Sequence, residues 1–234
     1  MKKRGVSLNN IAIITARGGS KRIPHKNIKN FCGKPIISYS IEAALQSELF
    51  SEVMVSTDSE EIADIAKRYG AVVPFLRSER TSDDFATTAD VLKEVLECYR
   101  ERGSLFDIMV CIYPTAPFVT SEKLKNAMEI LISEGVCTVM PVVSFSFPPQ
   151  RGFWLRNGRL QITNSDSFYK RSQDLEKIYH DAGQFYCYNV NKFLDGDDDT
   201  LPIIVSEMEV QDIDTEDDWK LAELKYSLMK NGGN

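Results

Sequence analysis

The first 41 of the 234 residues contain no aspartate or glutamate. Acidic residues begin at Glu42, although the whole chain carries 34 acidic and 28 basic residues and a formal net charge of −6. A protein that binds nucleic acid normally presents basic side chains over an entire face, so this acidic chain is not expected to bind it. The nine Lys and Arg residues before Glu42 instead predict one local basic site, suited to a small phosphorylated ligand.

Several familiar patterns are also missing. The five cysteines are odd in number, widely spaced and free of CxxC pairs, which is typical of reduced thiols in a cytoplasmic protein. No stretch approaches the roughly 18 apolar residues of a membrane span, and the apolar stretch after the basic start is too short for a signal peptide. The two histidines stand beside no GxSxG-type serine, so a hydrolase triad is not expected. We therefore expect a cytoplasmic protein without membrane contact.

What the sequence does contain is a short apolar strand, residues 11–16, that opens into a loop rich in glycine and cations. Glycines let backbone N–H groups approach phosphate oxygens, and Lys or Arg neutralises the remaining charge. A plain turn is the simpler alternative, but the density of cations argues against it. The loop matches neither GxGxxG nor GxxxxGK[ST], so it is neither a dinucleotide fingerprint nor a P-loop. Its glycines and cations are Gly18, Gly19, Arg17, Lys21, Arg22 and Lys26.

Strand-like and helix-like segments alternate along the first two-thirds of the chain. Such alternation predicts an α/β fold in three layers, with helices covering a mixed, mainly parallel sheet in a single domain over residues 1–234. The predicted strands are residues 11–16, 52–57, 71–76, 107–113 and 136–143. The predicted helices are residues 35–45 with proline in the first turn, 58–69, 88–100 and 121–133.

The rhythm changes after residue 144. Asn157 and Gly158 lie between two strand-like runs, which is the strongest short-range pattern for a β-hairpin. Residues 145–182 are therefore interpreted as an inserted element that stands out from the main sheet and is a candidate for dimer contact. Strands are expected again at 184–190 and 203–205, before a final helix that begins near Thr215.

Two carboxylates near the end of the chain, Asp212 and Asp214, predict a metal site. In an extended segment the side chains at i and i+2 point to the same side, where they can share a hard cation such as Mg²⁺. The alternative is that Asp214 or Thr215 caps the last helix. Asp58, after the second strand, is another candidate acidic contact, and helix capping explains it equally well.

The run from Ala16 to Asn27 resembles the opening of the CMP-nonulosonate synthetases, cytidylyltransferases that activate sialic acid and related nine-carbon keto-sugars. The resemblance covers nearly the whole chain and implies a Rossmann-like nucleotide-diphospho-sugar transferase fold with a protruding dimerisation hairpin element. It also implies a homodimer that uses CTP, a nonulosonic acid and Mg²⁺. It continues at residues 33–35, 55–58, 83–84, 87–88, 114–117 and 211–215.

The resemblance also implies roles for individual residues. Catalytic roles in neutralising the triphosphate fall on Arg17, Lys21, Lys26 and Asn27, and nucleotide contacts fall on Ala16, Gly18, Gly19, Ser20, Thr87 and Thr88. Helix N-capping is an equal explanation for one of the two threonines. Sugar contacts are expected at Tyr113, Arg171, Gln173, Gln184 and Tyr186, and the two residues of the insertion are candidates for contacts across a dimer interface. Arg22, Lys29 and Lys34 are better explained as solvated surface cations.

Within the family, residues 113–118, 171–175 and 179–186 most resemble the members that act on pseudaminic acid. The expected reaction is attack of the sugar's anomeric hydroxyl on the α-phosphate of CTP, which gives the CMP-sugar and pyrophosphate. Enzymes for N-acetylneuraminic or legionaminic acid remain the nearest alternative. A non-catalytic module that binds CTP for regulation is an alternative from another class.

Overall fold

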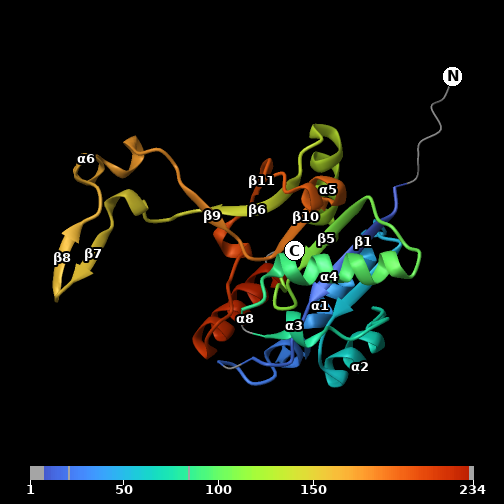
Figure 1. Ribbon diagram of the computed structural model, residues 1–234. Coiled ribbons are helices and arrows are strands. Elements are labelled where there is room, and N and C mark those ends of the chain that lie inside the picture. Colours follow the sequence, from blue (N-terminus) through green and yellow to red (C-terminus); the bar gives the residue numbers. More distant parts are fainter. Residues whose placement is uncertain (1–7, 21, 84, 232–234) are drawn as a thin grey trace.

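The computed structural model describes residues 8–20, 22–83 and 85–231. A central sheet carries helices on both faces, and an arm projects from one side (Figure 1). The strand order is β11-β6-β10-β5-β1-β4, and β9 pairs with β6 beside this path. The strands are β1 (Asn10–Thr15), β4 (Glu52–Ser56), β5 (Ile108–Ile112), β6 (Thr138–Ser144), β9 (Tyr179–Asp181), β10 (Phe185–Asn189) and β11 (Thr200–Ile204).

The sheet is mixed and mainly parallel, as the sequence predicted. Strand β1 pairs in parallel with β4 and β5, and β11 pairs in parallel with β6. Strand β10 lies between β5 and β6 and runs antiparallel to both. Because of this reversal, Phe185 at the start of β10 lies opposite Ile112 at the end of β5.

Alternate residues of the strands build two separate hydrophobic layers. Ala12 and Ile14 of β1 belong to one buried cluster, and Ile11 and Ile13 belong to the other. This alternation follows from the two-residue period of a strand, and it accounts for the three layers of the predicted fold. The first cluster includes residues of α1 (Ile37–Ser47), α2 (Glu60–Arg68) and α5 (Ser121–Glu134), and the second includes residues of α4 (Thr88–Glu101) and α7 (Val190–Asp195).

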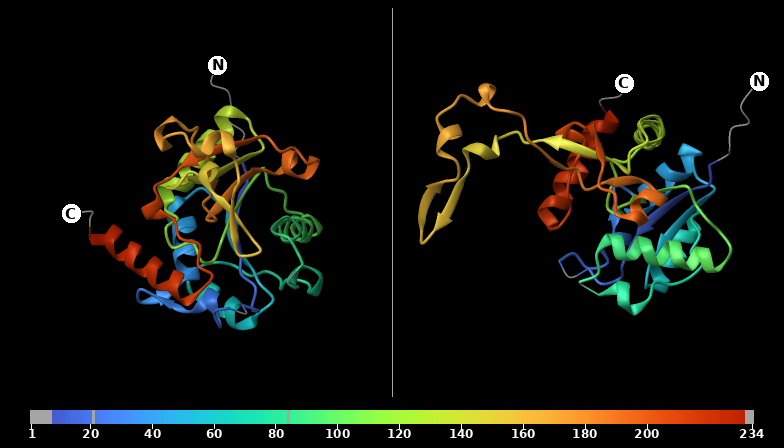
Figure 2. Two further views of the ribbon diagram at one scale, coloured as in Figure 1. Left: turned by 90° about the vertical axis from the view of Figure 1, so that its left-hand side faces the viewer. Right: turned by 45° about the horizontal axis from the view of Figure 1, so that its top comes forward.

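A third hydrophobic cluster joins the beginning of the chain to its end. Ile23 and Phe31 from the N-terminal loop are buried with Ile213 and Trp219. The rings of Phe31 and Trp219 meet edge to face with centroids 5.6 Å apart. As a result, helix α8 (Glu216–Asn231) lies beside the N-terminal loop, as red and blue segments show in Figures 1 and 2.

The arm consists of residues 145–178 and extends away from the sheet (Figures 1 and 2). It contains η2 (Pro149–Arg151), β7 (Phe153–Arg156), β8 (Arg159–Ile162), α6 (Ser165–Phe168) and η3 (Ser172–Asp174). Strands β7 and β8 pair antiparallel, and Asn157 and Gly158 between them have positive φ angles of 52° and 72°. The hairpin predicted from these two residues is therefore confirmed. Strand β9 follows the arm and pairs with β6, so residues 179–181 belong to the main sheet.

Two of the expected elements differ in the structure. Residues 71–76 do not form a strand, because only Val72 bridges to Met54 and Pro74, which has no N–H group, follows two residues later. Pro35 does not lie in the first turn of a helix, since it pairs in the short hairpin of β2 (Asn30–Phe31) and β3 (Lys34–Pro35). The remaining short helices are η1 (Lys26–Ile28), α3 (Glu79–Ser82) and η4 (Glu207–Glu209). Within the described ranges, no helix is both long and apolar enough to cross a membrane.

Candidate active site

A cavity of about 510 Å³ lies where β1 and β5 end. This is the edge at which open α/β sheets commonly bind ligands, because the loops that follow neighbouring strands meet there. The N-terminal loop, the turn after β5 and the segment before α8 all contribute to it. Its lining residues are Thr15, Arg17, Ser20, Arg22, Lys26, Asn27, Tyr113, Pro114, Thr115, Asp212 and Asp214.

The N-terminal loop is held in place by polar contacts with its own backbone and with Asp58, which follows β4. Asn27 is buried, and its side-chain amide donates to the carbonyl oxygen of Arg17 at 2.8 Å. The N–H of Gly18 donates to Oδ1 of Asp58 at 2.7 Å. A Cβ atom at position 18 would lie 3.2 Å from Cβ of Ser59, so a side chain there would require Ser59 to shift by a few tenths of an ångström.

Asp58 thus has a role that the sequence analysis did not consider. Ser59, not Asp58, is the N-cap of α2, since its side chain accepts from the N–H of Ile62. Asp58 holds the glycine loop instead. The amide of Gly18 points to this carboxylate, so an expected contact of that amide with phosphate would require the bond to Asp58 to be replaced.

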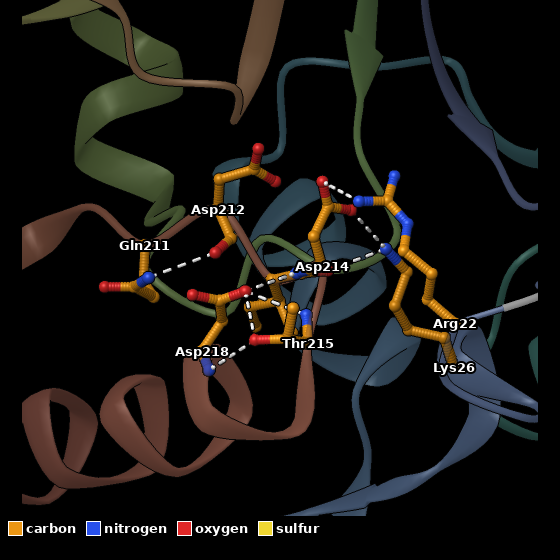
Figure 3. A network of polar contacts seen from close by, with 8 residues as sticks. Arg22, Lys26, Gln211, Asp212, Asp214, Thr215 and Asp218 are labelled. Atoms are coloured by element: carbon orange, nitrogen blue, oxygen red, sulfur yellow. Dashed lines mark hydrogen bonds and ion pairs between the residues drawn. The ribbon is translucent and has the colours of Figure 1, made fainter. Parts of the chain in front are cut away.

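Cations from the beginning of the chain meet a carboxylate from its end (Figure 3). The Nζ of Lys26 lies 2.7 Å from the carbonyl oxygen of Ile213 and 3.4 Å from Oδ1 of Asp214. The Nη1 of Arg22 donates to Oδ2 of Asp214 at 2.9 Å. Two clusters that are far apart in sequence are therefore parts of one site.

The position of Asp214 is set by the first turn of α8. The carboxylate of Asp218 accepts from the backbone N–H groups of Asp214 and Thr215, at 3.1 and 2.8 Å, and from the hydroxyl of Thr215 (Figure 3). In return, the hydroxyl of Thr215 accepts from the N–H of Asp218. This reciprocal arrangement is a capping box, so Thr215 caps the helix as one of the sequence alternatives held.

Asp212 and Asp214 both line the cavity, and their hard oxygen atoms suit a divalent cation. Burial, and next the negative charge of Asp214, raise the pKa of the Asp212 carboxyl above its usual value. A cation between them would relieve this repulsion. Among the described residues, no group of three or more His, Cys, Asp or Glu side chains could hold a metal. A pair of carboxylates is nonetheless what Mg²⁺ commonly uses when phosphates and water complete its octahedron, so the residues present fit Mg²⁺.

A second cavity, of about 220 Å³, adjoins the first and shares Thr15 and Arg17 with it. Arg77 lines it and donates to the backbone oxygen and the hydroxyl of Ser56, at 2.8 and 3.1 Å. Burial lowers the pKa of Arg77 below its ordinary value. Sequence reasoning missed Arg77, because it follows a segment wrongly assigned to a strand and belongs to no motif. The other residues that line this cavity are Thr81, Asp83, Ala86, Thr88 and Val91.

The expected nucleotide-binding residues have different positions in the structure. Thr88 lines the second cavity, whereas Thr87 forms a complete capping box with Asp90 at the start of α4. Ala16 is fully buried, and its N–H donates to the backbone of β4. Ser20 lines the first cavity. Lys21, which was expected to be catalytic, lies outside the described residues.

The expected sugar-binding residues fall into two groups. Tyr113 lines the first cavity, and its ring lies 5.5 Å from that of Tyr186. The hydroxyl of Tyr186 donates to Asp181, and burial, followed by this hydrogen bond, raises the pKa of the Tyr186 phenol. Gln184 is buried, and its side-chain amide donates to the backbone oxygen of Glu209.

Arg171 and Gln173 form the other group, because they lie in the arm. Both are exposed, and Arg171 pairs with Asp174 at 2.8 Å. Neither residue lines the cavities of its own chain. The structure of one chain therefore brings together the loop, the Asp pair and Tyr113, but not these two arm residues.

Comparisons with known proteins identify the family of this chain. Residues 11–201 match the family model described as cytidylyltransferase. The chain belongs to the cytidylyltransferase family. The predicted nucleotidyltransferase class and the predicted family membership are thereby confirmed.

Individual relatives extend the match beyond that region. Pseudaminic acid cytidylyltransferase of Campylobacter jejuni is 40% identical over 94% of this chain and 97% of its own. CMP-N,N'-diacetyllegionaminic acid synthase of Legionella pneumophila is 36% identical over 93% of this chain and 96% of its own. A solved structure of CMP:2-keto-3-deoxy-manno-octonic acid synthetase complexed with CTP aligns with a TM-score of 0.68 over 95% of this chain and 99% of its own. Its sequence identity is 16%, so this likeness concerns the fold alone.

Proposed function

We propose that this cytidylyltransferase joins CTP to pseudaminic acid and releases CMP-pseudaminic acid and pyrophosphate. The observation that carries the proposal is the meeting of Lys26 with Asp214 in one cavity, since a nucleoside triphosphate needs cations and a site for its divalent ion together. The relative named for pseudaminic acid, matched over nearly the full length of both chains, supports this sugar.

In the proposed reaction the anomeric hydroxyl oxygen of the sugar attacks the α-phosphorus of CTP. A bond forms between this oxygen and phosphorus, the bond to the β-phosphate breaks, and the hydroxyl proton is released. Arg17 and Lys26 lie in the cavity, where they would neutralise the charge that passes to pyrophosphate. Asn27 keeps the loop closed through its bond to the backbone of Arg17. Catalysis then rests mainly on positioning and charge neutralisation.

Asp212 and Asp214 would hold Mg²⁺, which would supply positive charge to the triphosphate and polarise the reacting phosphate. The protein's own contribution is to hold the backbone of Asp214 through the capping box of Thr215 and Asp218.

The proposal is tested with purified protein, CTP, Mg²⁺ and a panel of nonulosonic acids. Pyrophosphate release and the mass of the CMP-sugar are measured for pseudaminic, legionaminic and N-acetylneuraminic acids. We expect the highest kcat/KM with pseudaminic acid. Legionaminic acid is the second candidate, because the Legionella relative matches with almost the same coverage. The absence of pyrophosphate release with every sugar would refute a catalytic role.

A regulatory module that binds CTP without turnover is the alternative from another class. Calorimetry distinguishes it, because such a module would bind CTP tightly and release no pyrophosphate. The presence of Lys26, Asp212 and Asp214 in one cavity argues for turnover. We also propose that the protein acts in the cytoplasm, which its five free cysteines support.

We further propose that the protein works as a homodimer in which the arm contacts a second copy of the chain. Every residue of β7 and β8 is exposed, including Trp154, Leu155 and Leu160 at 56, 73 and 66%. An apolar hairpin that projects into solvent buries little surface within its own chain, so a partner would be needed to cover it. A second copy is the favoured occupant, because Arg171 and Gln173 of the arm lack a place at their own cavity.

Sedimentation of the wild type and of a variant with Trp154→Asp and Leu155→Asp tests this dimer. We expect a dimer and a monomer, respectively, while Leu105→Asp, at an exposed position on the main body, leaves the dimer intact. Mixing Arg171→Ala and Lys26→Met chains, each impaired alone, should restore part of the activity if each arm reaches the partner's cavity. A monomeric wild type would contradict the proposal.

A further inference from the structure

The sequence analysis interpreted Arg22, Lys29 and Lys34 as solvated surface cations. In the structure one of the three differs from the others in its position. Lys29 pairs with Glu216 of α8 at 2.7 Å. Lys34 pairs with Glu42 on α1. Only Arg22 of these three lines the first cavity, where it contacts Asp214.

Arg22 and Lys26 bind the same carboxylate in different ways. The Nζ of Lys26 is also anchored to the carbonyl oxygen of Ile213, and its side chain is 21% exposed. The side chain of Arg22 is 68% exposed, and within the part of the chain that the structure describes its polar contact is with Asp214. An exposed ion pair of this kind is weak and easily exchanged, because water solvates both partners when it breaks. Arg22 is therefore the cation that can leave Asp214 without disturbing the loop.

The contact made by Arg22 occupies an oxygen atom of Asp214, the residue that is proposed to bind the divalent cation. The Nη1 of Arg22 lies 2.9 Å from Oδ2 of Asp214 (Figure 3). A guanidinium group at this position occupies one acceptor of Asp214 and repels a divalent cation. The same group lies in the cavity beside Arg17 and Lys26, where the triphosphate is proposed to bind.

We propose that Arg22 is a triphosphate-binding residue that exchanges partners: it holds Asp214 until CTP arrives and then transfers its guanidinium to the phosphates. This inference rests on the proposed function and adds a residue to it. The exchange frees Asp214 for the divalent cation at the moment when the nucleotide brings it. It also places a planar, bidentate donor on the phosphates that depart as pyrophosphate. Metal binding is thereby made dependent on nucleotide binding.

The exchange predicts that one variant, Arg22→Ala, binds the divalent cation more tightly and CTP more weakly than the wild type. Binding of Mn²⁺ without nucleotide, followed by electron paramagnetic resonance, should become about three- to tenfold tighter, because a positive charge leaves Asp214. Binding of CTP with Mg²⁺ and no sugar, followed by calorimetry, should become about tenfold weaker, because a phosphate contact is lost. A variant that retains the charge, Arg22→Lys, should match the wild type in Mn²⁺ affinity and bind CTP with an affinity between those of the wild type and Arg22→Ala, because lysine keeps the charge but not the bidentate donor.

Arg100→Ala is the matched control. Arg100 is 65% exposed and pairs with Glu97 near the far end of α4, so its removal changes the net charge equally and should alter neither affinity. Circular dichroism and melting temperature show that each variant is folded. An unchanged or weaker Mn²⁺ affinity in Arg22→Ala overturns the exchange, and so does an unchanged CTP affinity. If the wild type releases no pyrophosphate, the proposed function fails, while these two binding measurements still decide the role of Arg22.

Discussion

The ammonium group of Lys26 donates to the carbonyl oxygen of Ile213 at 2.7 Å, across 187 positions of sequence. This bond to the backbone fixes the cation beside Asp214 independently of the carboxylate's charge. The two ends of the chain are further joined by Phe31 and Trp219. The relative position of cation and carboxylate is therefore a property of the packed core, and it should persist when the charge of Asp214 is removed.

Replacing Lys26 by methionine should remove a charge from the triphosphate site and leave the fold intact. We expect kcat/KM to fall by about 100-fold, as when one preorganised charge at a transition state is lost. Pyrophosphate release measures the effect, and the melting temperature reports on folding. Lys220→Met is the control, because Lys220 pairs with exposed Asp217 on α8 and should leave activity unchanged. Full activity of the Lys26 variant would show that the wrong loop has been assigned.

Removal of divalent ions should abolish turnover reversibly. Treatment with EDTA is expected to stop pyrophosphate release, and added Mg²⁺ should restore it. The variant Asp212→Asn should not recover at the same Mg²⁺ concentration, because a neutral amide is a poorer ligand for a hard cation. Titration of Mn²⁺ against both proteins provides a second measurement. Equal metal affinity in the two would disprove a ligand role for Asp212.

The neighbouring carboxylates of Asp217 and Asp218 in α8 offer a test of whether the helix cap positions Asp214. Asp218→Ala removes the acceptor for the N–H groups of Asp214 and Thr215, so we expect a loss of about 1 kcal/mol in the free energy of unfolding and a several-fold lower kcat. Asp217→Ala, whose side chain is 93% exposed, should change neither. Denaturant unfolding and steady-state rates distinguish the two variants. Identical behaviour of both would mean that the cap does not position Asp214.

The two adjacent threonines should separate into a structural and a ligand-binding residue. Thr87→Ala breaks the capping box of α4 and should cost about 1 kcal/mol of stability with an unchanged affinity for CTP. Thr88→Ala should lower the affinity for CTP and leave the stability unchanged, because Thr88 lines the second cavity. Calorimetry with CTP, combined with thermal unfolding, checks both. A lower CTP affinity in the stable, folded Thr87 variant would assign that residue to the nucleotide after all.

The same capping box should have a pH dependence of its own. Hydrogen bonds from Thr87 lower the pKa of the Asp90 carboxyl below its usual value of 3.8. Because the folded-state pKa is the lower one, the stabilisation is complete above the ordinary pKa and is lost as pH falls through the lowered pKa. The difference in melting temperature between wild type and Asp90→Asn should therefore be constant near neutral pH and shrink below about pH 4. A difference that grows on acidification would contradict this.

The sequence was most informative where local chemistry alone determines structure. Asn157 and Gly158 adopt the positive φ angles that a tight hairpin requires, and no distant residue is needed for this. The cation loop and the Asp pair were each recognisable from residue types at fixed spacing. That Lys26 and Asp214 meet in one cavity followed from the family resemblance, and the structure now gives the contact itself.

Features that depend on tertiary packing were out of reach. The strand expected at residues 71–76 is reduced to one bridge at Val72, because Pro74 cannot continue the ladder. Asp58 was a candidate for capping or metal binding, whereas its partner is Gly18, 40 positions earlier. Arg77 enters the second cavity through contacts with Ser56 that no local pattern encodes. Such roles arise from which segments the sheet places side by side.

The reversed direction of β10 has a consequence for how this protein can diversify. Because β10 begins at the edge where β1 and β5 end, the polypeptide arrives at the cavity directly from the arm and β9. Substitutions or length changes between residues 145 and 178 can therefore reshape the approach to Gln184 and Tyr186 while the loop after β1 keeps its framework. The proposed sugar contacts of the arm and of β10 could thus change among relatives without altering the loop that carries Lys26.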